Sequence, residues 1–276
     1  MDRRNFLKTG GMVVLGSMAA SSVLRAESLK GAHDASGISS ALNHFGVSQE
    51  DMKKVLAAAL EKGGDYADLF FEHTFNNYVG LQDGAVNRCN SNIDFGVGIR
   101  VLAGDQTGYA YVENVTLKEM LNAARTAARI ATGGKATLPV ALTDKPIKTN
   151  YYSVKMPWEE VILKSKMPYL QRLNDRIFAL DKRVHKVSAS LTDTTSHILF
   201  CNSEGVMYYD YRPMVTLGAV CIMEENGKVE NGYAARAYRM GFEFLNDDVV
   251  ELLAQEAVAK TSILFQAVKP KGGEMP

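Results

Sequence analysis

The sequence predicts an α+β protein built from two helix–antiparallel meander–helix domains. Residues 65–113 are rich in aromatic and β-branched residues and are interrupted at short intervals by turn residues, which is typical of an antiparallel meander. Amphipathic helical patterns come directly before and after this segment. The same order of helix, strands and helix recurs between residues 158 and 276, so a duplicated unit is a further hypothesis.

The first helix is expected to begin after Ser48, which starts an S-x-x-D pattern with Asp51. In such a pattern the first side chain accepts a hydrogen bond from a backbone N–H group that the helix leaves unpaired. Apolar residues then recur at helical spacing, at Met52, Val55, Leu56, Ala59 and Leu60. Gly63 and Gly64 are expected to end the helix, because glycine readily adopts the conformation found at helix ends.

Three turns are expected within the meander, at Asn76-Asn77, Asp83-Gly84 and Gly104-Asp105. Asn, Asp and Gly tolerate the positive φ angles that hairpin turns need. A second helix is expected to start at Thr116, which forms a capping box with Glu119, and to end at Gly133. Both helices would cover one face of the sheet, which leaves the other face to solvent or to another domain.

Residues 136–157 form an expected connector, because prolines stand there among Lys, Thr and Asn. After it, the pattern predicts a short helix over residues 158–166. A second helix is expected from Pro168 to Asp181, since proline fits the first position of a helix.

Strands of the second domain are expected over residues 184–191, 197–201, 206–211, 215–223 and 232–244. Pro213 closes the third of these strands, and Asn226 lies in a hairpin turn before the last one. Asn246 is expected to cap a final helix that continues towards Phe265.

The balance of charges argues against a nucleic-acid-binding protein, because 31 Lys and Arg residues match 31 Asp and Glu residues. The three cysteines, at positions 89, 201 and 221, fit neither a disulfide framework nor a C-x-x-C metal or redox motif. We interpret them as small buried apolar residues. A disulfide between Cys201 and Cys221 is the alternative.

The N-terminus resembles a twin-arginine export signal of the form R-R-x-F-L-K. The matching residues are Arg3, Arg4, Phe6, Leu7 and Lys8. The modestly apolar stretch that follows is too short for a permanent membrane anchor. We therefore expect residues 1–26 to be a signal peptide that the twin-arginine translocase exports to the periplasm, the alternative being an amphipathic helix docked on the first domain. Residues 27–44, rich in Ser, Ala and Gly, are expected to be a linker.

Seven motifs resemble the TldD/PmbA family of zinc metallopeptidases. Four lie in the first half: A-D-L-F-F-E (67–72), L-Q-D-G-A-V (81–86), D-F-G-V-G-I-R-V (94–101) and T-G-Y-A-Y (107–111). Three lie in the second half: C-N-S-E-G-V (201–206), M-G-F-E-F-L (240–245) and G-G-E-M-P (272–276). The chain is more similar to the TldD side of the family than to the PmbA side. The resemblance implies the family's N-terminal domain at residues 45–135 and its central domain at residues 158–276.

The zinc helix of this family carries an H-E-x-x-x-H motif, which in relatives follows the G-E-M-P segment. This sequence ends at Pro276 and does not contain the motif. Its histidines are scattered, and no two have the spacing of about one helical turn that zinc ligands on a helix need: His33, His44, His73, His185 and His197. We therefore expect no catalytic residue, metal ligand or cofactor in this chain, although zinc belongs to the full-length family, and we predict the chain to be inactive alone.

Other candidate residues are better explained by structure. His73 as a lone metal ligand, and His185 with His197 as a ligand pair, are disfavoured against ordinary strand residues. An acidic cluster comprises Asp65, Asp68 and Glu72. Paired carboxylates can catalyse proton transfer, but acidic residues at a helix-to-strand corner are usually solvated.

Three short patterns imitate functional motifs: Ser203-Glu204-Gly205, Asp105 with Thr107 and Gly108, and Gly96 with Gly98. The first is a turn without the G-x-S-x-G elbow, the second is also a turn, and the third lacks the third glycine and helix of a dinucleotide loop. An aromatic set would either line a peptide groove or pack on the sheet, and packing is favoured: Tyr208, Tyr209, Tyr211, Tyr233 and Tyr238.

The resemblance implies that the full-length protein cleaves unfolded or small peptides with zinc-activated water and pairs with a related subunit. The domains of this chain would then shape the wall of a peptide chamber, select extended peptides and hold the partner. An exposed edge of the 65–113 sheet would accept a peptide as an added strand. The alternative is a zinc-free exported module for peptide binding or assembly. The neutral charge and the export signal give little support to DNA or gyrase binding.

Overall fold

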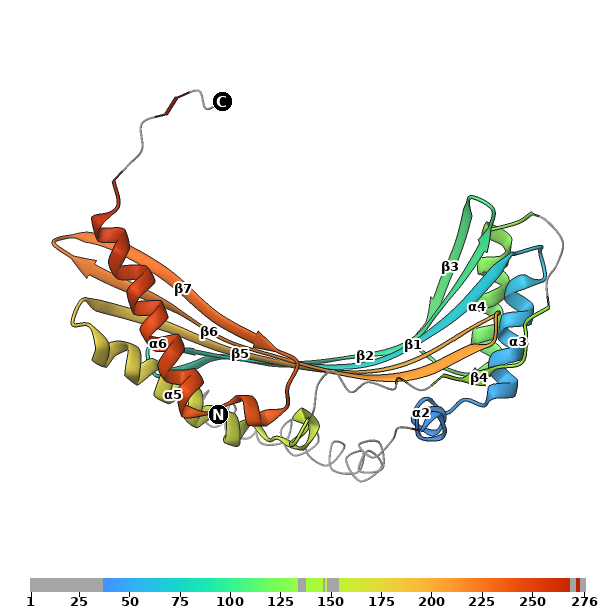
Figure 1. The fold of residues 1–276 in the computed structure, drawn as a ribbon, viewed down its shortest axis with the longest axis horizontal. Coiled ribbons are helices and arrows are strands. Elements are labelled where there is room, and N and C mark those ends of the chain that lie inside the picture. The colour runs from blue at the N-terminus through green and yellow to red at the C-terminus, as the bar shows by residue number, and fades with distance from the viewer. Residues whose placement is uncertain (1–36, 134–137, 146, 148–153, 269–271, 274–276) are drawn as a thin grey trace, which may run out of the picture. The chain divides into compact units, whose positions relative to one another are not determined.

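The computed structural model describes residues 37–133, 138–145, 147, 154–268 and 272–273 (Figure 1). The described residues belong to two compact units. Unit 1 takes its residues from 37–73, 95–147 and 197–210, and unit 2 takes its residues from 74–94, 154–196 and 211–273. Four strands, β1, β2, β5 and β6, contribute residues to both units, so neither unit is a continuous stretch of sequence.

Helices combine with a largely antiparallel sheet, which confirms the predicted α+β class. The strands are β1 (Tyr66–Gln82), β2 (Ala85–Ala103), β3 (Gln106–Val112), β4 (Thr143–Asp144), β5 (Val184–Asn202), β6 (Val206–Glu225) and β7 (Lys228–Tyr238). Their order is β3-β2-β1-β5-β6-β4, and β7 also pairs with β6. β3 pairs with residues 97–103 of β2, and β7 pairs with residues 215–225 of β6, both antiparallel. β4 pairs in parallel with residues 206–207 of β6.

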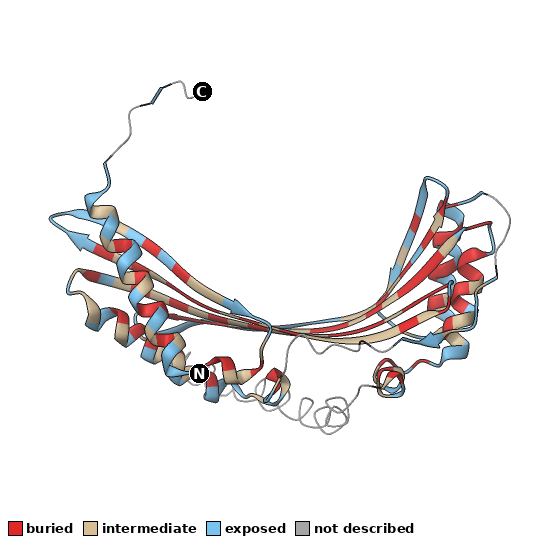
Figure 2. Ribbon diagram, viewed as in Figure 1, coloured by how far each residue is buried: buried red, intermediate tan, exposed pale blue. Residues whose placement is uncertain are grey.

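In unit 1, α3 (Gln49–Leu60) and α4 (Leu117–Ile130) pack beside each other against one face of the strands (Figures 1 and 2). The predicted caps are confirmed, because Ser48 Oγ accepts a hydrogen bond from Asp51 N at 3.0 Å and Thr116 Oγ1 accepts one from Glu119 N at 3.4 Å. The helices bury the predicted apolar stripes against residues of β1 and β2. Three residues from far along the chain complete this core: Leu199, Cys201 and Met207.

In unit 2, α5 (Leu163–Leu180) and α6 (Asp247–Ser262) pack against each other, and α6 also contacts β7. Asn246 caps α6 as predicted, since its Oδ1 accepts a hydrogen bond from Val249 N at 3.0 Å. Three short 3-10 helices flank these elements: η1 (Trp158–Glu160), η2 (Phe242–Phe244) and η3 (Ile263–Gln266). The core includes Val79 and Leu81 of β1 together with residues of α5, α6 and the later strands.

Strands β1, β5 and β6 are longer than predicted, because three expected interruptions do not occur. β1 continues through Asn76 and Asn77, and β5 joins the two segments that were expected to be separate strands. The predicted turn at Asn76-Asn77 is therefore wrong. The physical reason is lateral hydrogen bonding: Asn77 Nδ2 donates to Asp193 Oδ1 at 2.9 Å, and Thr194 Oγ1 donates to Asn76 Oδ1 at 2.9 Å.

Two prolines occupy positions that the sequence patterns did not predict. Pro213 lies inside β6, between the part paired with β4 and the part paired with β7, rather than at the end of a strand. Pro168 lies inside α5 rather than at its start. The other two expected turns are confirmed, with Asp83 at φ 50° and Gly104 at φ 55°.

Part of the expected linker is helical. Residues 38–44 fall within α2 (Ile38–Phe45), which buries Ile38, Ala41 and Phe45. These apolar residues are spaced three and four apart, which is a helical pattern. It was not recognised because the segment is rich in Ser, which is typical of linkers. The expected connector likewise contains β4. No helix in the described ranges is long and apolar enough to cross a membrane.

Candidate functional site

Three of the five histidines, which are far apart in the sequence, gather in unit 1. His44 comes from α2, His73 from β1 and His197 from β5. His73 Nδ1 and His44 Nε2 lie 2.8 Å apart, so one imidazole donates a hydrogen bond to the other. His44 also stacks on His197, with ring centroids 4.6 Å apart and ring planes inclined by 30°.

Aromatic side chains surround this histidine cluster. Phe95 of β2 meets His73 edge-on, with ring centroids 4.9 Å apart, and Tyr209 OH lies 2.7 Å from His197 Nδ1. His73 and His197 are buried. The sequence patterns did not predict this cluster, because His44 was expected to lie in a linker. The helical spacing of Ile38, Ala41 and Phe45, which α2 buries, was the sequence feature that could have predicted a helix around His44.

The cluster does not fit a zinc site. Zinc needs several ligand atoms that converge on one point at about 2.0–2.3 Å. Here the facing nitrogens of His73 and His44 bind each other, His197 Nδ1 binds Tyr209, and His44 meets His197 face to face. In the part of the chain that the structure describes, no group of three or more His, Cys, Asp and Glu side chains could hold a metal ion.

His185 belongs to unit 2 and is not part of this histidine cluster of unit 1. His185 is exposed on β5, the strand that also carries His197. The two are twelve residues apart in the sequence and belong to different units, and neither unit brings them together as a ligand pair. His33 lies outside the described residues, as do the export-signal residues Arg3, Arg4, Phe6, Leu7 and Lys8.

The acidic cluster divides into separate structural roles. Asp65 Oδ2 accepts a hydrogen bond from Gly104 N at 2.7 Å and so fastens the β2–β3 turn. Asp68 is buried and accepts hydrogen bonds from Arg100 Nε, at 2.9 Å, and Nη2. These bonds raise the pKa of Arg100 above its ordinary value. Glu72 is half-buried on the same strand. Asp68 is therefore not solvated, and its partner is a cation rather than a second carboxylate.

The three imitation motifs have structural roles. Ser203 is a turn residue that binds β1 twice, because Ala67 N donates to its Oγ at 3.0 Å and Ser203 N donates to Ala67 O at 2.8 Å. Gly108 packs against the backbone of α4, where a Cβ atom would lie 2.0 Å from Ala127 O. Gly96 and Gly98 lie within β2 and admit the backbone of Val112 and the ring of Tyr109.

The predicted aromatic set is divided between the units. Tyr208 stacks on Phe200 in unit 1, with ring centroids 5.0 Å apart, while Tyr209 belongs to the histidine cluster. In unit 2, Tyr211 OH donates to Glu159 Oε2 at 3.1 Å, and Tyr238 packs on Phe244. Tyr233 is exposed and covers Gly218. Each of the five rings therefore contacts another residue of the fold.

All three cysteines are free, which contradicts the alternative of a Cys201–Cys221 disulfide. Cys201 and Cys221 are buried, as predicted for small apolar residues, whereas Cys89 is exposed. Cys201 lies in the core of unit 1 with its Sγ 3.7 Å from Met52 Sδ, and burial raises the pKa of its thiol. Such a thiol is a poor nucleophile at neutral pH.

Unit 2 also contains a buried polar network that the sequence patterns did not predict. Lys166 of α5 and Asp193 of β5 form an ion pair with Nζ and Oδ2 2.5 Å apart, and their side chains are only 5% and 2% exposed. Asn77 of β1 donates to the second carboxylate oxygen at 2.9 Å. The lysine ammonium also lies 5.4 Å from the ring of Trp158. This network joins α5 to the sheet rather than forming a reactive centre.

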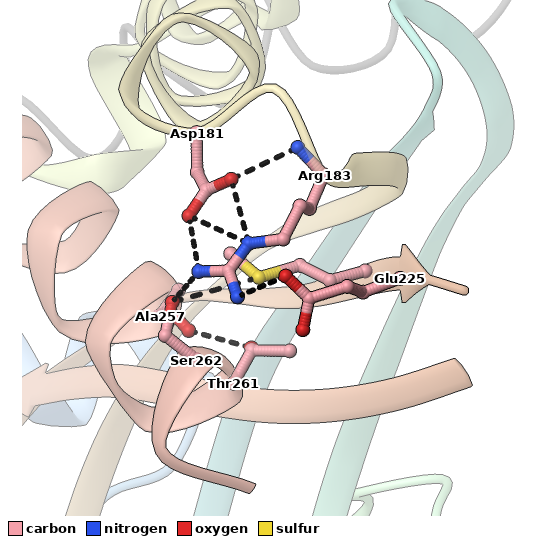
Figure 3. Close-up of polar contacts among 7 residues, drawn as sticks. Asp181, Arg183, Glu225, Ala257, Thr261 and Ser262 are labelled. Carbon is pink, nitrogen blue, oxygen red and sulfur yellow. Dashed lines mark hydrogen bonds and ion pairs between the residues drawn. The ribbon is translucent and has the colours of Figure 1, made fainter. Parts of the chain in front are cut away.

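Arg183 connects the ends of four elements in unit 2 (Figure 3). Its guanidinium donates to Asp181 Oδ2 at 2.7 Å, to Glu225 Oε1 at 3.2 Å and to Ser262 Oγ at 3.3 Å. Asp181 follows α5, Arg183 itself precedes β5, Glu225 ends β6 and Ser262 ends α6. The hydrogen bonds from Arg183 lower the pKa of Asp181 below its ordinary value of 3.8.

Comparison with protein families gives two matches in chain order. Residues 67–131 match the PmbA/TldA metallopeptidase domain 1, and residues 157–265 match the PmbA/TldA metallopeptidase central domain. A Haemophilus influenzae protein, the Metalloprotease TldD homolog, is 32% identical over 220 residues, which cover 77% of this chain and 45% of the relative. The chain therefore spans less than half the length of this relative.

Solved structures show the same fold. A proposed modulator of a DNA gyrase from Thermotoga maritima superposes with a TM-score of 0.63 at 18% identity, covering 81% of this chain and 50% of that one. TldE from Thermococcus kodakarensis superposes with a TM-score of 0.58 at 16% identity, covering 77% and 47%. Together, the two domain matches and the similarity to the metalloprotease show that this chain belongs to the TldD/PmbA family, of which it contains domain 1 and the central domain.

Proposed function

We propose that this chain is an exported TldD/PmbA-type protein whose two domains shape a peptide chamber and hold a related partner subunit. The reaction of the family would be zinc-dependent hydrolysis of small or unfolded peptides. The observation that carries the proposal is the match to domain 1 and then to the central domain of a metallopeptidase family, in that order. The similarity to a named metalloprotease supports it.

The described residues are assigned no step of peptide hydrolysis. None of their His, Cys, Asp and Glu groups fits a metal ion, and the clustered histidines already bind one another and Tyr209. The buried charges are likewise paired within the fold, as in Lys166 with Asp193. The proposed role of these domains is therefore to bind and position peptides rather than to activate water.

A peptidase assay tests this division of labour. Residues 27–276 are purified and incubated with unfolded proteins and short peptides, with and without added zinc, beside the H. influenzae relative. We expect micromolar peptide binding by fluorescence anisotropy and no cleavage by the chain alone. Cleavage that needs zinc and stops on chelation would contradict the proposed role.

Export is a separate part of the proposal and rests on the R-R-x-F-L-K pattern at residues 3–8. Replacing Arg3 and Arg4 by lysine keeps the charge but removes the paired arginines. We expect the wild-type chain in the periplasmic fraction and the double variant in the cytoplasm. A periplasmic double variant would show that the pattern is not a twin-arginine signal.

A second candidate function is a zinc-free exported module for peptide binding or assembly. The absence of a metal-binding group among the described residues favours it. Sequencing the gene beyond the codon for Pro276 separates the two candidates. An H-E-x-x-x-H continuation supports the metallopeptidase, whereas a stop codon together with co-purification of a larger relative supports the module.

A further inference from the structure

One segment of the sheet has an uncovered edge. Residues 85–94 of β2 are exposed at ten successive positions, so side chains on both faces of the strand meet solvent. The inner neighbour of β2 is β1, and β3 covers its outer edge only at residues 97–103. No strand among the described residues lies along the outer edge of residues 85–94. In unit 2, β7 covers the corresponding edge of β6.

This edge lacks several of the usual protections against strand pairing. Natural edge strands are commonly shortened, bulged, or marked by lysine or proline. Residues 85–94 contain neither lysine nor proline, and Asn is the most frequent residue of the segment. Its backbone has no positive φ angle. The N–H and C=O groups along the outer edge are therefore available to another strand.

The side chains of this segment are complementary to the same segment running in the opposite direction. Arg88 and Asp94 are its charged residues, and each lies three positions from Ser91. In an antiparallel pair of two copies centred on Ser91, Arg88 of each copy stands opposite Asp94 of the other. Directly opposed side chains of opposite charge stabilise a strand pair. The remaining opposed pairs join Cys89 to Ile93 and Asn90 to Asn92.

Neither charged residue forms an ion pair within the described part of this chain. The guanidinium of Arg88 lies 5.4 Å from the centre of the Tyr78 ring, and Asp94 accepts hydrogen bonds from Asn92 Nδ2 at 3.2 and 3.3 Å. Both are exposed, so both can meet a partner without leaving an ion pair in the fold. Ser91 also lies near the middle of the uncovered stretch, so most of that stretch can pair.

We propose that residues 88–94 of β2 pair antiparallel with the same residues of a second copy of this chain, with the two-fold axis at Ser91. The proposal rests on the proposed function, in which these domains hold a partner subunit, and identifies the surface and the partner. Dimerisation is measured without any peptide hydrolysis. A failure of this inference is therefore distinguishable from a failure of the proposed function.

Cysteine cross-linking tests the register in the full chain. In a Cys89→Ser background, Ser91→Cys places two thiols at the two-fold axis, and mild oxidation is expected to yield a disulfide-linked dimer. Val86→Cys in the same background is the matched control, because its two thiols would lie about 33 Å apart along the paired strands. Val86 is equally exposed, at 51%. Equal cross-linking of the two variants would overturn the proposed register.

Charge reversal tests the partner in sedimentation experiments. Arg88→Glu and Asp94→Arg are each expected to raise the dimer dissociation constant roughly tenfold, because each creates two like-charge pairs. The double variant should restore the wild-type dissociation constant, and circular dichroism should show an unchanged fold. A wild-type chain that stays monomeric at about 100 μM would overturn the proposal. So would a double variant whose dissociation constant stays above that of the wild type. The proposal would also be overturned if an added extended peptide or a related subunit, instead of a second copy, occupied this edge.

Discussion

At the scale of single residues, the pair of Lys166 and Asp193 is the least predictable feature of the chain. The two residues are 27 positions apart, and a lysine in an amphipathic helix is ordinarily a surface residue. They are buried because Asn77 of a third element satisfies the remaining carboxylate oxygen. No local sequence pattern contains that information, whereas the helix caps at Ser48, Thr116 and Asn246 are local and were predicted.

The buried pair leads to a stability prediction. Lys166→Met leaves the Asp193 carboxylate in the core without its cation, and we expect a loss of about 3–5 kcal/mol in the free energy of unfolding. Adding Asp193→Leu should recover much of that loss, since an apolar pair replaces an unpaired charge. Urea unfolding followed by Trp158 fluorescence measures both. The control Lys54→Met, at an exposed ion pair, should leave the midpoint close to that of the wild type.

The lowered pKa of Asp181 leads to a prediction about how the stability of the fold depends on pH. Its pKa in the folded protein lies below the ordinary value of 3.8 because Arg183 donates hydrogen bonds to the ionised carboxylate. The unfolded chain therefore binds this proton more readily, and the stabilisation is present above about pH 4 and is lost as pH falls through the folded pKa.

Urea midpoints at pH 7, 5 and 3 test this sign. Asp181→Asn should lower the midpoint at pH 7 and pH 5, and the difference from wild type should shrink at pH 3. In an Arg183→Met background the same substitution should have a small effect at every pH. A difference that grows towards acidic pH would contradict the assignment.

At the scale of elements, helices were predicted better than strands. Helix boundaries follow from caps and apolar spacing within one segment, and α3, α4 and α6 obey these rules. Strand length depends on neighbours. Asn76 and Asn77 favour a turn in isolation, yet the hydrogen bonds from Thr194 and to Asp193 keep them in β1. The histidine cluster was missed for the same reason, because α2 is positioned by its contacts with residues distant in sequence.

The close packing of α4 on β3 leads to a prediction about the stability of a variant. A Cβ atom at Gly108 would lie 2.0 Å from Ala127 O, which belongs to the helix backbone and cannot move without displacing α4. We expect Gly108→Ala to lower the free energy of unfolding by about 1–3 kcal/mol or more. Gly37→Ala is the matched control, because nothing lies within 4 Å of its added Cβ atom. Thermal unfolding of the two variants that gave equal midpoints would refute this packing argument.

At the scale of the whole molecule, the two family domains follow each other in sequence, but the two compact units do not. The core of unit 1 includes Leu199, Cys201 and Met207, which follow the connector, and the core of unit 2 includes Val79 and Leu81, which precede it. The sequence patterns predicted two separate meanders, because the alternation of apolar residues shows which face of a strand is buried but not which strand lies beside it.

Because strands contribute residues to both cores, we predict that neither family domain folds alone. A fragment of residues 45–135 would expose the core positions that face Leu199, Cys201 and Met207, and residues 158–276 would lack the β1 residues that complete the second core. We expect each fragment alone to show no cooperative urea transition, and the two fragments mixed in equal amounts to regain part of the native circular dichroism. Because Trp158 is the only tryptophan, its fluorescence in the mixture reports the second core directly. A cooperative transition in either isolated fragment would mean that the shared strands are dispensable, and that each sequence domain builds a sufficient core from its own residues.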